Sequence, residues 1–224
     1  MDLRQIQEQV VREVQGSELV GAIAHGSIRR EQYTAYLTDV YHYACHSAQV
    51  IGLAGSRMVR SHPQLADYLF SHAREELGHE HWATSDLRDL GRTDEDIARS
   101  TASEACTKML GLEYLYAAHL NPVGLFGWMF VLESLDGRVG GSIANALDAA
   151  LKLEGKALYF LRSHGEADAH HSEDLARVIE AHIISAEDQD DFQTMVSLSR
   201  KAYLEILDDV AKVKEQPVRN VARN

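Results

Sequence analysis

Residues 30–60 read REQYTAYLTDVYHYACHSAQVIGLAGSRMVR and contain no proline. Their apolar and aromatic side chains recur at the helical period, because Tyr33, Tyr36, Leu37, Val40 and Tyr41 stand at positions i, i+3, i+4, i+7 and i+8. This spacing places them on one face of an amphipathic helix. The segment therefore predicts one long helix with a face that packs against the core.

The same period extends over nearly the whole chain. Only three of the 224 residues are proline, and proline interrupts the hydrogen-bond ladder of a helix. We find no strand-like alternation and predict an all-α bundle of about seven to nine helices as one domain over residues 1–215, followed by a loose tail at 216–224. The other expected helices are 2–15, 17–24, 63–90, a short one after Thr93, 101–120, 122–135, 142–153, 156–163, 166–184 and 187–214, with interruptions at Gly137, Gly140, Gly141 and Gly165.

Charge and composition exclude several classes of function. The chain has 34 acidic and 22 basic residues, which give a formal net charge of -12. A surface this negative repels phosphate backbones, so we expect no nucleic-acid partner. No stretch reaches the roughly 18 apolar residues of a membrane span, so we expect no membrane partner. The two cysteines, Cys45 and Cys106, form no CxxC pair, which favours a reducing cytoplasm.

Two carboxylate–histidine patterns suggest metal ligands. Glu76 and His79 are three residues apart and share a face if the segment is helical. Paired Glu-x-x-His motifs supply ligands in di-iron bundle proteins. His164, Asp168 and His171 stand at i, i+4 and i+7, after the apolar residues 158–161. A solvated polar face is the alternative explanation, and it explains the first pair better than the second set.

A third candidate ligand is Glu133, which lies inside the apolar run Met129–Leu135. A buried carboxylate is costly unless it is paired or coordinates a metal. A hydrogen-bonded structural glutamate is the alternative. Combined, the three carboxylates and three imidazoles form an oxygen and nitrogen donor set that suits iron or manganese and is large enough for two ions. His42 and His46 are candidates to line the same cavity, and His72 precedes Glu76 by four residues.

These motifs together resemble a known family. The chain is similar to the heme-oxygenase-like di-iron oxidases, or iron-containing redox enzymes, in the superfamily of heme oxygenase, thiaminase II and pyrroloquinoline quinone synthase. The resemblance spans roughly residues 30–185. It rests on Tyr36–Tyr43 (YLTDVYHY), Glu75–His79 (EELGH), Val131–Glu133 (VLE), and Phe160–His164 (FLRSH) followed by Asp168 and His171.

The resemblance implies a helical bundle with a central cavity and metal-ligand roles for Glu76, His79, Glu133, His164, Asp168 and His171. It further implies two ferrous ions, dioxygen as co-substrate, and a small organic substrate such as an amine, an amino acid or a fatty acid. Many family members are homodimers, so we expect a homodimer here. We expect Tyr41 and His42 to act in catalysis by orienting ligands or substrate.

The chain departs from the family in one respect, which leaves alternatives open. Some members carry a further carboxylate on an early helix, where this chain offers His42 and His46. A single-metal site, for example of Glu76, His79 and His164, is therefore an alternative, and spacing alone chooses Glu76 over Glu75. A non-catalytic binding protein and a cofactor-free oxidase also remain open. A thiaminase-like role lacks a cysteine near Glu133, and a heme oxygenase role leaves the ligand set unexplained.

Overall fold

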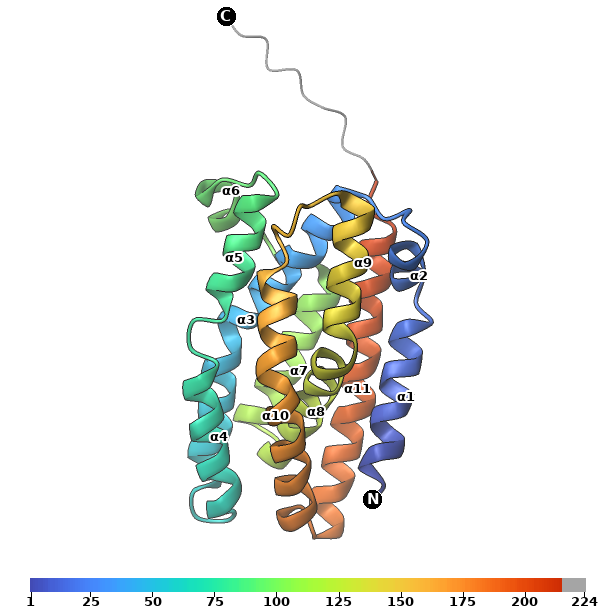
Figure 1. Ribbon diagram of the computed structural model, residues 1–224. Coiled ribbons are helices and arrows are strands. Elements are labelled where there is room, and N and C mark those ends of the chain that lie inside the picture. The colour runs from blue at the N-terminus through green and yellow to red at the C-terminus, as the bar shows by residue number, and fades with distance from the viewer. Residues whose placement is uncertain (215–224) are drawn as a thin grey trace, which may run out of the picture.

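The computed structural model describes residues 1–214, apart from the side chains of residues 136, 137 and 164–171. This part of the chain forms helices and no strands (Figure 1). The helices are α1 (Leu3–Gln15), α2 (Glu18–Ala24), α3 (Arg30–Met58), α4 (Pro63–Glu75), α5 (Glu80–Asp89), α6 (Asp94–Ala98), α7 (Glu104–Ala118), α8 (Leu125–Leu135), α9 (Gly141–Leu151), α10 (Tyr159–His182) and α11 (Ala186–Ala211). A 3-10 turn (Pro122–Gly124) precedes α8, and a π-helical turn (Asp136–Gly140) joins α8 to α9.

Polar side chains fix the starts of several helices. Asp2, Ser17, Ser103 and Ser185 each accept a hydrogen bond from a backbone N–H in the first turn of the helix that follows. These N-H groups have no partner inside the helix, so the cap satisfies them. Thr93 and Asp96 cap α6 reciprocally, which confirms the short helix expected after Thr93.

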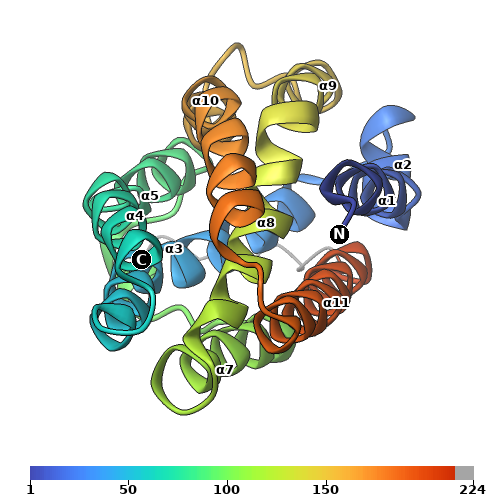
Figure 2. The same ribbon diagram turned by 90° about the horizontal axis from the view of Figure 1, so that it is seen from below.

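The long helix α3 packs against several others. It contacts α4, α5, α7 and α11, and it buries Tyr33, Leu37 and Val40 almost completely. Viewed from below, α8 lies in the middle of the bundle, bordered by α7, α10 and α11 (Figure 2). The buried apolar side chains form one connected core. The all-α bundle predicted from the helical period is confirmed.

Close approach of α8 and α11 depends on one glycine. A Cβ atom on Gly127 would lie 2.5 Å from the backbone oxygen of Phe192 and 2.7 Å from the backbone nitrogen of Val196. Any larger residue would therefore push the two helices apart. This contact fixes the helix that carries Glu133 against its neighbour.

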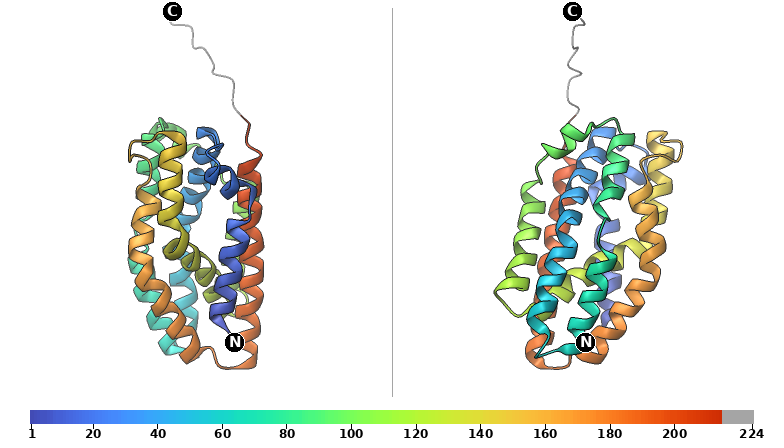
Figure 3. Two further views of the ribbon diagram at one scale, coloured as in Figure 1. Left: turned by 45° about the vertical axis from the view of Figure 1, so that its right-hand side comes forward. Right: turned by 90° about the vertical axis from the view of Figure 1, so that its left-hand side faces the viewer.

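Residues 63–90 do not form the single helix predicted from their pattern. The chain leaves helical geometry at Glu76 and resumes it at Glu80, so α4 and α5 follow each other along α3 with an interruption between them (Figure 3). Gly78 has a φ of +98°, a conformation that side chains other than glycine rarely adopt. The glycine therefore permits the turn that ends α4 and starts α5.

Two predicted interruptions were also wrong. The backbone of α10 runs through Gly165 without a break, and it begins at Tyr159 rather than at Lys156. The glycines at 137, 140 and 141 do not end the helical path, because a π-helical turn carries it from α8 into α9. Gly140 lets α10 approach closely, since a Cβ atom there would lie 3.2 Å from the backbone oxygen of Leu161. Within the described residues, no helix is both long and apolar enough to cross a membrane.

Candidate metal centre

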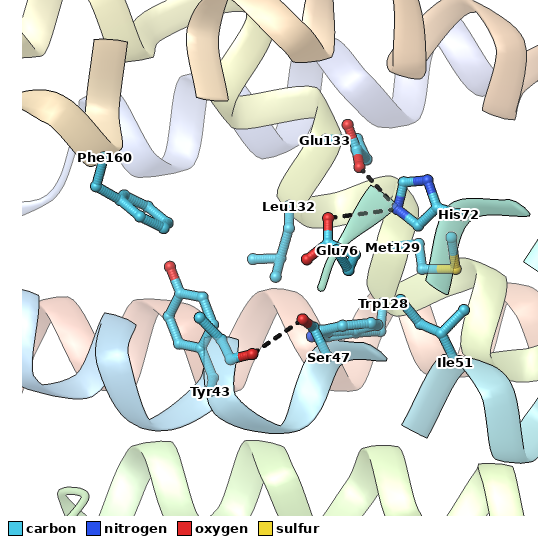
Figure 4. A pocket seen from close by; sticks show the side chains of 11 residues that line it. Tyr43, Ser47, Ile51, His72, Glu76, Trp128, Met129, Leu132, Glu133 and Phe160 are labelled. Atoms are coloured by element: carbon cyan, nitrogen blue, oxygen red, sulfur yellow. Dashed lines mark hydrogen bonds and ion pairs between the residues drawn. The ribbon is translucent and has the colours of Figure 1, made fainter. Parts of the chain in front are cut away.

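Three buried side chains converge between α4 and α8. The imidazole Nε2 of His72 lies 3.3 Å from Oε1 of Glu133 and 3.7 Å from Oε1 of Glu76. One ligand atom from each residue fits within 4.8 Å of the other two. Figure 4 shows the three side chains pointing toward one another. They are 4% to 8% exposed, so water screens their charges little.

The end of α4 places two of these groups. His72 lies in the last turn of α4, and Glu76 follows it by four residues, so the two side chains project to the same side. The interruption after Glu76 then brings His79 back to the site, with its Nδ1 3.4 Å from Oε1 of Glu76. The ring of His79 stacks on Trp82 with centroids 4.0 Å apart. The Glu76–His79 pairing expected from spacing therefore forms across a turn and not along a helix.

Glu133 reaches the site from α8, whose other described side chains are largely apolar. Glu133 is 7% exposed. Burial of an ionised carboxylate costs several kcal/mol unless a partner or a metal compensates it, and here two carboxylates are buried together. A divalent cation between Glu76, Glu133 and His72 would offset both charges.

A cavity of about 40 Å³ opens beside these groups. From α3 it is lined by Tyr43 and Ser47, and from α8 by Trp128 and Leu132 (Figure 4). Phe160 of α10 closes another side. Apart from His72, Glu76 and Glu133, the described lining residues are mostly aromatic and aliphatic. Such a lining excludes bulk water from reactive groups in the cavity.

Asp86 fixes the start of α10 next to this cavity. Its two carboxylate oxygens accept hydrogen bonds of 2.8 Å from the backbone N–H groups of Tyr159 and Phe160. Burial raises the pKa of Asp86 to about 6, although the two hydrogen bonds oppose that rise. A carboxylate at a helix N-terminus is also favoured by the helix dipole. Asp86 therefore fixes the first turn of α10, which places Phe160 in the wall of the cavity.

The donor set fits a hard or borderline divalent metal. Imidazole and carboxylate ligands suit iron or manganese, and no thiolate is among the grouped residues. Of the residues predicted as ligands, Glu76, His79 and Glu133 lie together. His164, Asp168 and His171 lie outside the residues whose side chains are described, so their roles stay predictions. His72 was expected only as a neighbour, and its i, i+4 spacing to Glu76 was the available clue.

Tyr41 and His42, predicted to act in catalysis, do not line this cavity. Nε2 of His42 lies 3.0 Å from the hydroxyl oxygen of Ser100, and the ring packs edge-on against Tyr41. Nδ1 of His46 lies 2.9 Å from the Tyr114 hydroxyl. These side chains project from other faces of α3 than Tyr43 and Ser47 do. Neither residue is among those that line the cavity, and the catalytic role expected for Tyr41 and His42 stays a prediction.

Comparison with known proteins bears directly on this site. The sequence model of a family described as iron-containing redox enzymes matches residues 34–203, which include His72, Glu76 and Glu133. The chain belongs to this family of iron-containing redox enzymes. A comparison with curated protein sequences gives no match.

Solved structures show that this family member has a heme oxygenase-like fold. A domain of unknown function with that fold from Shewanella denitrificans is 27% identical, with a TM-score of 0.86 over 95% of this chain and 93% of the other. A TenA homologue from Pseudomonas syringae pv. tomato is 15% identical, with a TM-score of 0.77 over 94% and 91%. A TenA homologue from P. horikoshii is 15% identical, with a TM-score of 0.68 over 94% and 96%. The likeness to the TenA homologues concerns the fold alone.

Neither Cys45 nor Cys106 lines the cavity, so neither is in position to act as a nucleophile there. Cys106 is buried in α7, and its thiol donates a hydrogen bond to the backbone oxygen of Asp39. Burial raises the pKa of this thiol above its usual range, which disfavours the reactive thiolate. Cys45 is exposed, and it is not among the residues that line the cavity.

Proposed function

We propose that this protein is an iron-dependent oxidase or oxygenase that uses dioxygen to oxidise a small organic molecule. The observation that carries the proposal is the convergence of His72, Glu76 and Glu133 in a buried, mostly apolar cavity. Membership of a family of iron-containing redox enzymes supports iron as the metal. An amine, an amino acid or a fatty acid is the expected kind of substrate.

His72, Glu76, His79 and Glu133 would hold the iron, and His164, Asp168 and His171 are the proposed remaining ligands of a two-iron site. When bound, ferrous iron supplies the electrons that reduce dioxygen and make it reactive toward the substrate. The chain's own contribution is to hold the ligands and exclude water. The stack of Trp82 on His79 fixes the orientation of that imidazole.

The cavity wall favours an uncharged or apolar portion of the substrate next to the ligands. Trp128, Leu132 and Phe160 offer aromatic and aliphatic surface, while Tyr43 and Ser47 carry the hydroxyl groups of the lining. We propose that the working form is a homodimer in the cytoplasm, whose partners are the substrate and dioxygen rather than nucleic acid or membrane.

Anaerobic loading with ferrous iron tests the proposal. We expect close to two irons per chain, followed by oxygen consumption and a change in the visible spectrum when oxygen is admitted. One iron per chain would restrict the site to a single-metal centre. Full loading without any oxygen consumption would favour a metal-binding protein with no oxidase activity. Failure to bind iron would contradict the proposal and leave a binding protein or a cofactor-free enzyme.

A further inference from the structure

A second cavity lies apart from the grouped ligands, against the other side of the α8–α10 contact. It has a volume of about 40 Å³ and is lined by residues of α1, α2, α3, α8, α9, α10 and α11 together with the π-helical turn. Its lining is aliphatic and aromatic, as represented by Ile23, Ile143, Leu147, Leu161 and Leu207. Among the residues whose side chains the structure describes, none that lines this cavity is acidic, basic or histidine.

The polar groups in this lining are engaged with one another or with the backbone. The Tyr33 hydroxyl donates a hydrogen bond of 2.6 Å to the backbone oxygen of Ala157. The hydroxyl groups of Tyr36 and Tyr203 lie 3.2 Å apart and form a hydrogen bond with each other. A water molecule needs two to four polar partners to occupy a buried cavity, and apolar cavities instead stay dry and bind small apolar molecules.

The second cavity and the ligand-lined cavity share three structural elements, which are α3, α8 and α10. Phe160 lines the ligand-lined cavity, and the next residue of α10, Leu161, lines the apolar one. In the same way Leu132 of α8 faces the first cavity and Leu135 faces the second. A molecule held in the apolar cavity is therefore separated from the ligand-lined cavity by the end of α8 and the start of α10.

We propose that the apolar cavity is a binding site for dioxygen, from which the ligand-lined cavity is supplied. The inference rests on the proposed function, because only an oxygen-consuming reaction needs such a supply. Dioxygen is small, uncharged and apolar, and it matches an apolar cavity in which the described hydroxyl groups are already hydrogen-bonded. A charged substrate would find no charged partner among the lining side chains that the structure describes.

Xenon is the probe for the cavity itself, because it is an apolar gas without chemistry. In protein with ¹³C-labelled isoleucine methyl groups, xenon pressure should shift the Ile23 and Ile143 signals in a saturable manner. The Ile184 signal, from a side chain that is 74% exposed, should not shift. Unchanged Ile23 and Ile143 signals would overturn the proposal. This measurement needs neither iron nor a variant.

Kinetics test the role of dioxygen. Ile143→Phe fills the cavity, and Ile184→Phe makes the same change at an exposed position. At limiting oxygen, Ile143→Phe should slow ferrous oxidation at least threefold, with iron content unchanged, whereas Ile184→Phe should match the wild type. Equal rates in all three proteins would overturn this inference and leave the oxidase proposal intact. An iron-loaded wild type that binds xenon but consumes no oxygen would overturn both proposals.

Discussion

Nε2 of His72 lies 3.3 Å from Oε1 of Glu133, although the two residues belong to different helices that sequence spacing does not relate. This contact joins the last turn of α4 to α8, and it brings together two of the three residues that could hold a metal ion. Because both side chains are buried, a cation placed between them would interact with each in a medium that screens charge weakly.

Replacement of His72 tests whether it is a ligand. His72→Ala removes an imidazole from the buried group. We expect the affinity for ferrous iron to fall at least about tenfold, because loss of a residue that only hydrogen-bonds to a metal ligand already lowers metal affinity by that much. Anaerobic calorimetric titration measures the change. His25→Ala is the matched control, because His25 is exposed and bonds the backbone oxygen of Gly21. Unchanged affinity in His72→Ala would remove His72 from the donor set.

Glu113 should make the stability of the protein depend on pH. Its side chain is fully buried in α7, and burial raises its pKa well above the ordinary 4.5. Because the pKa of Glu113 is higher in the folded state than in the unfolded state, the folded state binds the proton more tightly. The contribution of protonated Glu113 to the stability of the protein is complete below pH 4.5 and is lost as the pH rises through the folded pKa. Over that range the free energy of unfolding should fall by about 1.4 kcal/mol per pH unit on account of this group.

The Glu113→Gln variant cannot ionise, so it should be more stable than the wild type at pH 7 and about equal to it near pH 4. Urea unfolding at several pH values measures the difference. Glu104→Gln is the control, because that carboxylate lies exposed on the same helix and pairs with Lys108 at the surface. Parallel pH profiles for the wild type and Glu113→Gln would show that Glu113 is not held protonated.

Asp86→Asn should loosen the start of α10. An asparagine has a single carbonyl oxygen, so one of the two backbone N–H groups at Tyr159 and Phe160 loses its partner. We expect faster hydrogen exchange at these two amides, measured by mass spectrometry or NMR, and little change in α11. The exposed Asp67→Asn change on α4 is the control. Identical exchange in both variants would mean that Asp86 does not hold this turn.

Gly127→Ala and Gly111→Ala should have opposite effects on stability. At Gly127 the added methyl group meets the backbone of α11, and we expect a loss of about 1–3 kcal/mol or more, as for other overpacked contacts. At Gly111, also within a helix, an added Cβ meets nothing within 4 Å. There alanine should gain up to about 1 kcal/mol, because it is the better helix former. Thermal or urea unfolding compares the two, and a stable Gly127→Ala would contradict the close approach.

The helical period of the apolar residues was enough to predict the fold class of this protein from its sequence. It marked the apolar face of α3, and with the scarcity of proline it identified an all-α bundle. It also picked out Glu133, because a carboxylate inside an apolar run needs a partner wherever the run packs. Glu76 and His79 were likewise recognised as a pair, although the helix expected to hold them is interrupted at Gly78.

Tertiary structure decided which helix faces meet. Spacing along a helix shows that His42 and His46 share a face, and that His72 and Glu76 do. It does not show which neighbour covers that face. In the folded chain, His42 and His46 are covered by α7 and the segment before it, where they form hydrogen bonds with Ser100 and Tyr114. His72 and Glu76 are instead covered by α8, which brings Glu133 to them. The donor set therefore exists only after packing, because ligands from separate helices converge through contacts that no local pattern encodes.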